Sequence, residues 1–134
     1  MNEKAKPDTI KLAAGTGRIY DMPGMSAIFK ADEAETEAAY SISEWWLEPR
    51  TRGPGAHSHA ANDEVFYGIG GVMTVLVGED WHDIAPGDFL RIPAGTIHDF
   101  ENRTGERAGL LNFYIPGGFE RDMPAIVDWF KVNR

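Results

Sequence analysis

The chain has no cysteine, which excludes a disulfide framework, a zinc–thiolate site and a cysteine nucleophile. It also lacks a long apolar run. Its most apolar stretch, residues 68–78, is interrupted by glycines and is much shorter than the roughly 18 residues that a membrane-spanning helix needs. Positive charge is scarce, with 13 Lys and Arg against 21 Asp and Glu and a net charge of -8. This balance gives no attraction for nucleic acid or anionic membranes, so we expect neither as a partner.

The amino-terminal residues carry charges of both signs and lack the apolar core of a secretory signal. We therefore expect a cytoplasmic protein. A length of 134 residues with 43% hydrophobic residues is typical of one domain with its own core. We predict a single domain over residues 1–134, with an amino-terminal arm over about 1–18, a barrel over about 19–116 and a carboxy-terminal helix over about 119–132.

Most of the sequence alternates short β-like segments with turn residues, a pattern that predicts an all-β sandwich or barrel. The predicted strands are 19–30, 37–48, 64–69, 72–77, 89–92, 97–102 and 108–115. The tail differs, because Phe119, Met123, Ile126 or Val127, and Phe130 follow helical spacing. We expect this terminal helix to cover an open edge or mouth of the sheet, with Pro124 in its first turn.

Two histidines and a glutamate form the first candidate cluster. On an extended strand His57 and His59 would point to the same side, and a turn after them would bring Glu64 alongside on the returning strand. Two imidazoles and one carboxylate are the ligand set of non-haem iron sites, and they also suit Mn, Ni, Cu or Zn. An isolated His-x-His pair is more often two ordinary surface histidines, so the interpretation needs a second segment.

Residues 87–102 supply that segment, because they predict a strand, a Pro-Ala-Gly turn and a second strand that carries His98 near its start. Alternation places His98 on the same face as Phe100 and Asn102. His98 is therefore available as a fourth ligand. The remaining histidine, His82, is flanked by acidic residues near a turn, and we interpret it as solvated surface.

Together the two segments resemble the paired signature motifs of the cupin superfamily. The first motif, His-x-His followed by Glu and then Gly, is matched by His57, His59, Glu64 and Gly71. The second is matched without a gap by Gly87, Pro93, Gly95, His98 and Asn102. The leading glycine of the first motif falls at Thr51, with Gly53 and Gly55 nearby, a departure that affects the expected shape of the loop before His57 and not the ligands.

The resemblance implies a double-stranded β-helix, or jelly-roll barrel, with a short carboxy-terminal helix. It implies one divalent transition metal, which could be Fe, Mn, Ni, Cu or Zn, held by His57, His59, Glu64 and His98. One or two coordination positions would stay open, as in catalytic sites. A cupin that keeps the motif for stability, or binds metal weakly, is the alternative. The resemblance also implies a homodimer, with the arm before Ile19 as a candidate for exchange between subunits.

Alternation suggests the surroundings of the metal, because Phe66 shares a face with Glu64 and Phe100 shares one with His98. These rings would wall a pocket for a small apolar or aromatic substrate, or simply fill the core. Trp45 and Trp46 must point to opposite faces, and the sequence does not say which is interior. Glu44 shares the face of Trp46; an interior Glu44 would be an extra acid or base, although an outward carboxylate is commoner.

The leading functional hypothesis also comes from the resemblance. The segment from Ile115 to Glu120 is similar to the one that follows the last strand in small quercetinase-like monocupins. This likeness implies a metal-dependent dioxygenase of a small phenolic or enolic compound, with Glu64 as ligand and catalytic base. One alternative is a non-redox isomerase, lyase or cyclase that uses the metal as a Lewis acid. Another is a small-ligand-binding cupin without turnover.

Overall fold

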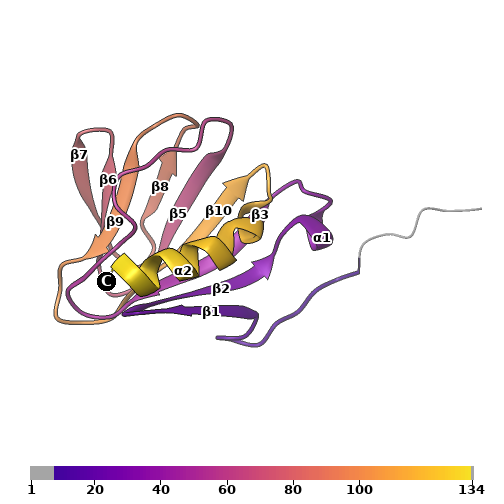
Figure 1. Ribbon diagram of the computed structural model, residues 1–134, viewed down its shortest axis with the longest axis horizontal. Helices are drawn as coiled ribbons and strands as arrows, with labels where there is room; N and C mark the ends of the chain where they lie inside the picture. The colour runs from indigo at the N-terminus through magenta and orange to yellow at the C-terminus, as the bar shows by residue number, and fades with distance from the viewer. Residues whose placement is uncertain (1–7, 134) are drawn as a thin grey trace, which may run out of the picture.

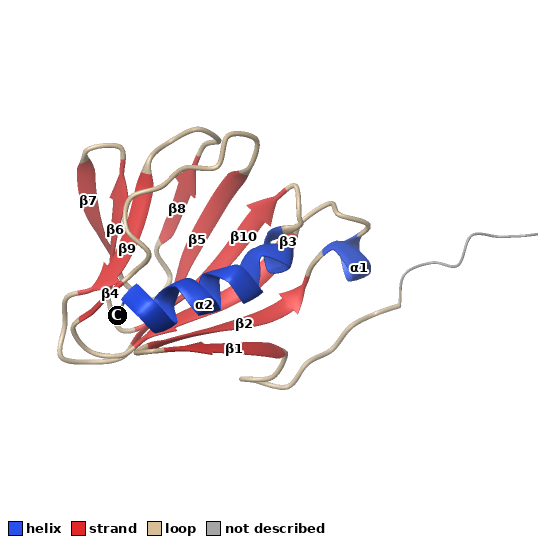
Figure 2. Ribbon diagram, in the orientation of Figure 1, coloured by secondary structure: helices blue, strands red, loops and turns tan. Residues whose placement is uncertain are grey.

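Two antiparallel sheets form the molecule in the computed structural model, which describes residues 8–133 (Figure 2). The six-stranded sheet has the order β1 (Arg18–Met22), β2 (Met25–Ala31), β3 (Ser41–Leu47), β10 (Ala108–Ile115), β5 (Asp63–Gly70) and β8 (Phe89–Ile92). The four-stranded sheet has the order β4 (Thr51–Arg52), β9 (His98–Asn102), β6 (Met73–Val77) and β7 (Asp80–Ile84). The predicted all-β jelly-roll architecture is confirmed.

The structure corrects two of the predicted segments and adds the strands β4 and β7, which were not predicted. Residues 19–30 are two strands of a hairpin, with a turn at Pro23 and Gly24. The strand predicted from residue 37 begins only at Ser41, because a one-turn helix, α1 (Glu33–Thr36), precedes it. The strand β7 was not predicted, since four of its five residues are exposed and give no alternating pattern. His82 lies on this strand and is exposed, as expected.

Inward-facing residues of both sheets build one core. On β3 the burial alternates strictly, so that Trp45 is 7% exposed in the interior and Trp46 lies outside. The guanidinium of Arg107 covers the Trp46 ring at 4.4 Å from its centroid. Glu44 also faces outward, with one carboxylate oxygen 3.3 Å from the amine of Lys30. An interior acid at this position, one of the two possibilities, is therefore wrong.

The tail forms a short 3-10 helix, η1 (Phe119–Asp122), followed by α2 (Met123–Asn133), which crosses in front of the large sheet (Figure 1). Met123 and Phe130 are buried, and Ile126 and Val127 pack against the core from partly buried positions. Pro124 is the second residue of α2, where its missing N–H has no helical partner to lose. The predicted terminal helix is confirmed.

Polar contacts fasten this tail to the strands beneath it. The buried carboxylate of Asp32 accepts hydrogen bonds from the backbone N–H groups of Gly118, at 2.7 Å, and Glu120, at 2.6 Å. The Glu120 side chain in turn accepts from Arg18 and from the hydroxyl of Tyr20, each at 2.7 Å. Burial alone would raise the pKa of Glu120, but the hydrogen bonds from Arg18 and Tyr20 outweigh it and lower that pKa.

Residues 8–17 of the predicted amino-terminal arm form no helix or strand, and residues 1–7 lie outside the described residues. Exchange of the arm between subunits stays a prediction. Over the described range 8–133, no helix is both long enough and apolar enough to span a membrane.

Candidate metal centre

The backbone brings the two histidine segments together. His57 and His98 exchange main-chain hydrogen bonds of 3.0 and 2.8 Å, which fix the loop between β4 and β5 against the first residue of β9. A further bond, from the Gly95 N–H to the His59 carbonyl at 2.8 Å, anchors the other end of the loop. The extended strand expected at His57 and His59 is not formed, because only His57 pairs in this way and His59 lies in irregular backbone.

Glycines shape the loop before His57, at the place where the motif departs from the cupin pattern. A β-carbon at Gly53 would lie 1.9 Å from the carbonyl oxygen of Phe100, so no side chain fits there. Gly55 has a φ of 92°, a left-handed conformation that favours glycine. Its carbonyl lies 2.7 Å from His57 Nδ1. Gly53 and Gly55 thus allow the loop to turn His57 inward although Thr51 replaces the leading glycine.

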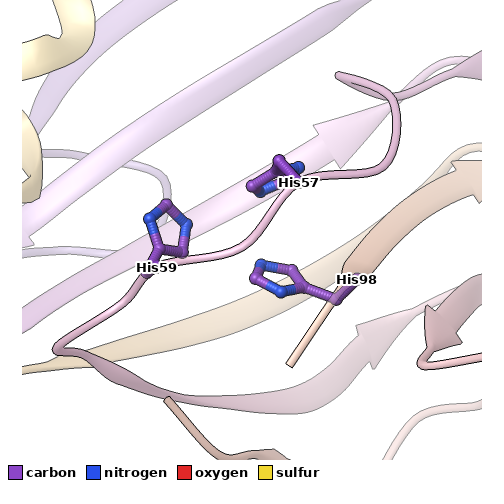
Figure 3. A group of neighbouring side chains, drawn as sticks. All are labelled: His57, His59 and His98. Atoms are coloured by element: carbon purple, nitrogen blue, oxygen red, sulfur yellow. The ribbon is translucent and has the colours of Figure 1, made fainter. Parts of the chain in front are cut away.

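The three imidazoles converge on one point (Figure 3). One ring nitrogen from each of His57, His59 and His98 lies within 4.8 Å of the others. The ring centroids of His57 and His98 are 4.3 Å apart, and His59 lies 5.1 and 5.3 Å from them. Such spacing is what a single ion bound by three imidazoles requires.

Hydrogen bonds orient two of these rings. The Nδ1 atoms of His57 and His98 face the carbonyls of Gly55 and Thr96, at 2.7 and 2.9 Å. A carbonyl only accepts, so each Nδ1 carries the hydrogen and each Nε2 keeps a free lone pair. This is the orientation that metal-binding histidines commonly take. The third ring, His59, has its Nδ1 3.4 Å from the hydroxyl of Tyr114.

Glu64 completes the cluster from β5. It is 4% exposed, and its carboxylate oxygens lie 2.8 Å from His98 Nε2 and 3.7 Å from His59 Nε2. Even so, both of these nitrogens and Glu64 Oε2 are buried without a hydrogen bond from any described residue. A cation bound among these atoms would satisfy the lone pairs that face one another. The donor set of three imidazoles and one carboxylate fits a divalent transition metal.

The proton affinities of the rings reflect this arrangement. Burial lowers the pKa of His59. At His98 burial acts in the same direction, but the negative charge of Glu64, 2.8 Å away, outweighs it and raises the pKa above its ordinary value. A proton therefore competes with a metal more strongly at His98, next to the carboxylate, than at His59.

A cavity adjoins the cluster inside the barrel. Its wall is mostly apolar and comes from both sheets and the tail; the lining residues are Trp45, Pro54, His57, Glu64, Phe66, His98, Phe100, Leu110, Asn112, Phe119 and Phe130. The centre of a water molecule can occupy about 40 Å³ of it. Phe66 and Phe100 line the cavity and also belong to the core, with ring centroids 6.0 Å apart. The pocket-wall and core interpretations thus describe the same two rings.

The sequence did not predict Asn112, Tyr114, Phe119 or Phe130 as part of this site. Asn112 and Tyr114 lie on the same buried face of β10 as Leu110, at every second position. A polar residue on an otherwise apolar strand face was a usable signal for Asn112. The two phenylalanines carry no such signal, because helical spacing marks them as packing residues and not as the wall of a site.

The fold and the cluster of three histidines define a small β-barrel protein with a candidate metal centre. A family model described as "Cupin domain" matches residues 43–114, more than half of the chain. The chain belongs to the cupin family.

Three known proteins show the range of this similarity. Over 66 residues the chain is 35% identical to quercetin 2,3-dioxygenase of Bacillus subtilis (strain 168), a match that covers 48% of this chain and 19% of that relative. A cupin from Silicibacter pomeroyi described as a sugar phosphate isomerase is 26% identical, with a TM-score of 0.63 and coverage of 75% of this chain and 68% of that one. Oxalate decarboxylase from Bacillus subtilis, studied for its Mn(II) centres, has a TM-score of 0.72 at 18% identity and covers 89% and 32% of the two chains. The last likeness supports the fold alone.

Proposed function

We propose that this cupin is a metal-dependent dioxygenase that acts on a small phenolic or enolic compound. His57, His59, Glu64 and His98 would hold the metal. The observation that carries the proposal is the group of unsatisfied lone pairs on His59, His98 and Glu64, which meet beside a cavity with aromatic walls. The match to a quercetin dioxygenase over 66 residues supports the same class of reaction.

The chain's own residues have separable roles in this proposal. A bound redox-active metal would supply the dioxygen chemistry. Glu64 is placed to accept the proton of a substrate hydroxyl, since its carboxylate is buried and aimed at the cluster. The rings of Trp45, Phe66 and Phe100 hold the apolar part of the substrate. Phe119 and Phe130 line the cavity from the tail side and would limit the access of water to a bound substrate.

The size of the cavity limits the substrate. A volume of about 40 Å³ for water centres suits a compound of few heavy atoms, whereas drug-sized ligands occupy pockets of roughly 300–1,000 Å³. A flavonol needs Phe119 or Phe130 to move away. We therefore place small enols and single-ring phenols ahead of flavonols as substrates.

A non-redox isomerase, lyase or cyclase is the second candidate. The similarity to the Silicibacter pomeroyi cupin described as a sugar phosphate isomerase favours it. A metal that polarises a carbonyl and a carboxylate that moves a proton would be enough for this chemistry. No Lys or Arg lines the described cavity, so this version needs an uncharged substrate rather than a phosphate ester.

We further propose a cytoplasmic homodimer that pairs through edge strands of the large sheet. Ile19 on the edge strand β1 is 55% exposed and Phe89 on the opposite edge strand β8 is 65% exposed. Apolar side chains on an unpaired edge favour association with another chain. Sedimentation equilibrium of the wild type, compared with Ile19→Asp and Phe89→Asp, tests this; a monomeric wild type contradicts it.

Oxygen consumption tests the reaction. The protein is loaded separately with Fe, Mn, Ni, Cu and Zn and given catechols, small enols and flavonols in an oxygen-electrode cell. We expect oxygen uptake with at least one redox-active metal and none with Zn, and loss of uptake in His98→Ala. His82→Ala is the matched control, because this histidine is exposed on β7, away from the cluster. Turnover that persists without oxygen supports the non-redox reaction, and no oxygen uptake with any metal contradicts the dioxygenase.

A further inference from the structure

Asn112 is a buried amide that the proposed chemistry does not use. It is 3% exposed in the middle of β10, and it lines the same cavity as His57, Glu64 and His98. Among residues 8–133, none forms a hydrogen bond to its side chain, and its amide is not among the fully enclosed unpaired atoms, so it borders the cavity space. A carboxamide can donate two hydrogen bonds and accept two, so without a protein partner this amide is free to bind a ligand or water in the cavity.

Another buried asparagine in the same barrel shows what a structural role requires. Asn102 is 2% exposed, and its Nδ2 faces the carbonyl oxygens of Leu47, Glu48 and Glu106 within 3.1 Å. Its Oδ1 accepts from the backbone and hydroxyl of Thr104. Asn102 therefore ties loops together. Asn112 connects no such segments. Its neighbour on the adjacent strand, Ser43, accepts a hydrogen bond from Trp45 Nε1 at 3.0 Å and not from Asn112.

The strand register gives the position of Asn112 relative to the cluster. Tyr114 lies opposite Glu64, and Asn112 lies opposite Phe66, in the next inward-facing row of the sheet. Diagonal neighbours of this kind have β-carbons about 7 Å apart. A ligand whose oxygens bind the metal can therefore reach Asn112 with a second polar group only if a few bonds separate that group from the metal-binding oxygens.

We infer that the Asn112 carboxamide is a substrate-binding group, and that it selects a small compound with an uncharged hydroxyl or carbonyl a few bonds from its metal-binding oxygens. The inference rests on the proposed metal-dependent function and adds the substrate class. The group is uncharged because the amide is neutral and the cavity wall contains no Lys or Arg. The rest of the wall at this depth is apolar, with Phe66 and Leu110 beside Asn112. This wall would reject a polar group placed elsewhere.

The test compares two metal-chelating probes of equal size, glycolohydroxamate and propionohydroxamate, which differ only in a hydroxyl in place of a methyl group. The protein is loaded with Co(II), and binding is followed by the visible spectrum of the ion. We expect the wild type to prefer the hydroxyl probe by about tenfold or more, because the probe satisfies the buried amide. This first measurement needs no variant.

Variants then locate the preference. Asn112→Leu has a similar volume and should bind Co(II) and propionohydroxamate as the wild type does, while the preference for the hydroxyl disappears or inverts. Ser43→Ala is the matched control, because it removes a buried hydroxyl opposite Asn112 on the neighbouring strand. This hydroxyl accepts a hydrogen bond from Trp45, and Ser43 does not line the cavity. It should keep the preference.

The outcomes separate this inference from the proposed function. A wild type that binds Co(II) and both probes without preference overturns the role of Asn112 and leaves the metal centre in place. A preference that survives in Asn112→Leu does the same. A wild type that binds no Co(II) overturns the proposed function and this inference with it.

Discussion

Asp32 is expected to hold the tail over the cavity, and its replacement gives the sharpest test of the packing. Its carboxylate is 3% exposed, and it accepts from the N–H groups on either side of Phe119, those of Gly118 at 2.7 Å and Glu120 at 2.6 Å. Hydrogen bonds to a charged group contribute roughly 1.5–3 kcal/mol each. Because the Glu120 N–H is partly buried and can turn to water, we expect Asp32→Ala to cost near the lower sum, about 3 kcal/mol.

The assay is equilibrium unfolding in urea, with hydrogen exchange of the Gly118 and Glu120 amides as the local measurement. Asp32→Asn keeps one acceptor oxygen and should lose about half as much stability. Asp128→Ala on α2 is the control, since that side chain is 78% exposed and forms only an i,i+3 pair with Lys131, and it should change stability by less than about 0.5 kcal/mol. An Asp32→Ala protein within about 0.5 kcal/mol of the wild type, with unchanged exchange at both amides, would refute the reasoning.

Three further predictions concern the metal, the tail and the cavity. A divalent metal at a free concentration 1,000 times its Kd should stabilise the fold by about 4 kcal/mol, measured as a higher Tm. His98→Ala should abolish this rise in Tm and His82→Ala should keep it. An equal rise in both variants contradicts the site. The pKa of Glu120 is lowered in the fold, so the ionised side chain stabilises the fold above its unfolded pKa, and this stabilisation is lost as the pH falls through the folded pKa. Glu120→Gln should therefore lower the free energy of unfolding by about 1 kcal/mol at pH 7 and not at all near pH 2. A stability difference in urea unfolding that does not shrink in acid contradicts this prediction. Phe130 is 2% exposed and lines the cavity, so Phe130→Ala should lower the free energy of unfolding by about 3–5 kcal/mol. The metal-loaded variant should also bind a flavonol that the wild type excludes, measured by fluorescence. Equal binding by both proteins contradicts the size limit.

Local spacing in the sequence predicted much of the fold, and the resemblance to cupin motifs supplied the candidate ligands. Alternation and turn residues predicted most strands, and the helical spacing of Phe119, Met123 and Phe130 predicted the tail helix. The two motif segments named the histidines that the structure brings within 4.8 Å. Periodicity works here because each of these features depends on neighbours within one strand or one turn. It failed at β7, where both faces are mostly exposed and the pattern disappears.

The surroundings of the cluster were decided only by the tertiary structure. Alternation shows that Trp45 and Trp46 differ in direction, but only the packing of one sheet on the other puts Trp45 inside. Phe119 and Phe130 reach the cavity because Asp32 and Arg18 hold the tail across the barrel. The partners in these contacts are far apart in the sequence, 102 residues for Arg18 and Glu120 and 86 for Asp32 and Gly118. Asn112 becomes significant because β10 lies between β3 and β5, where its side chain lines the cavity and no residue of the range 8–133 forms a hydrogen bond to it. Contacts between residues so distant in the chain leave no period in the sequence, so the shape and selectivity of the cavity follow from the folded barrel.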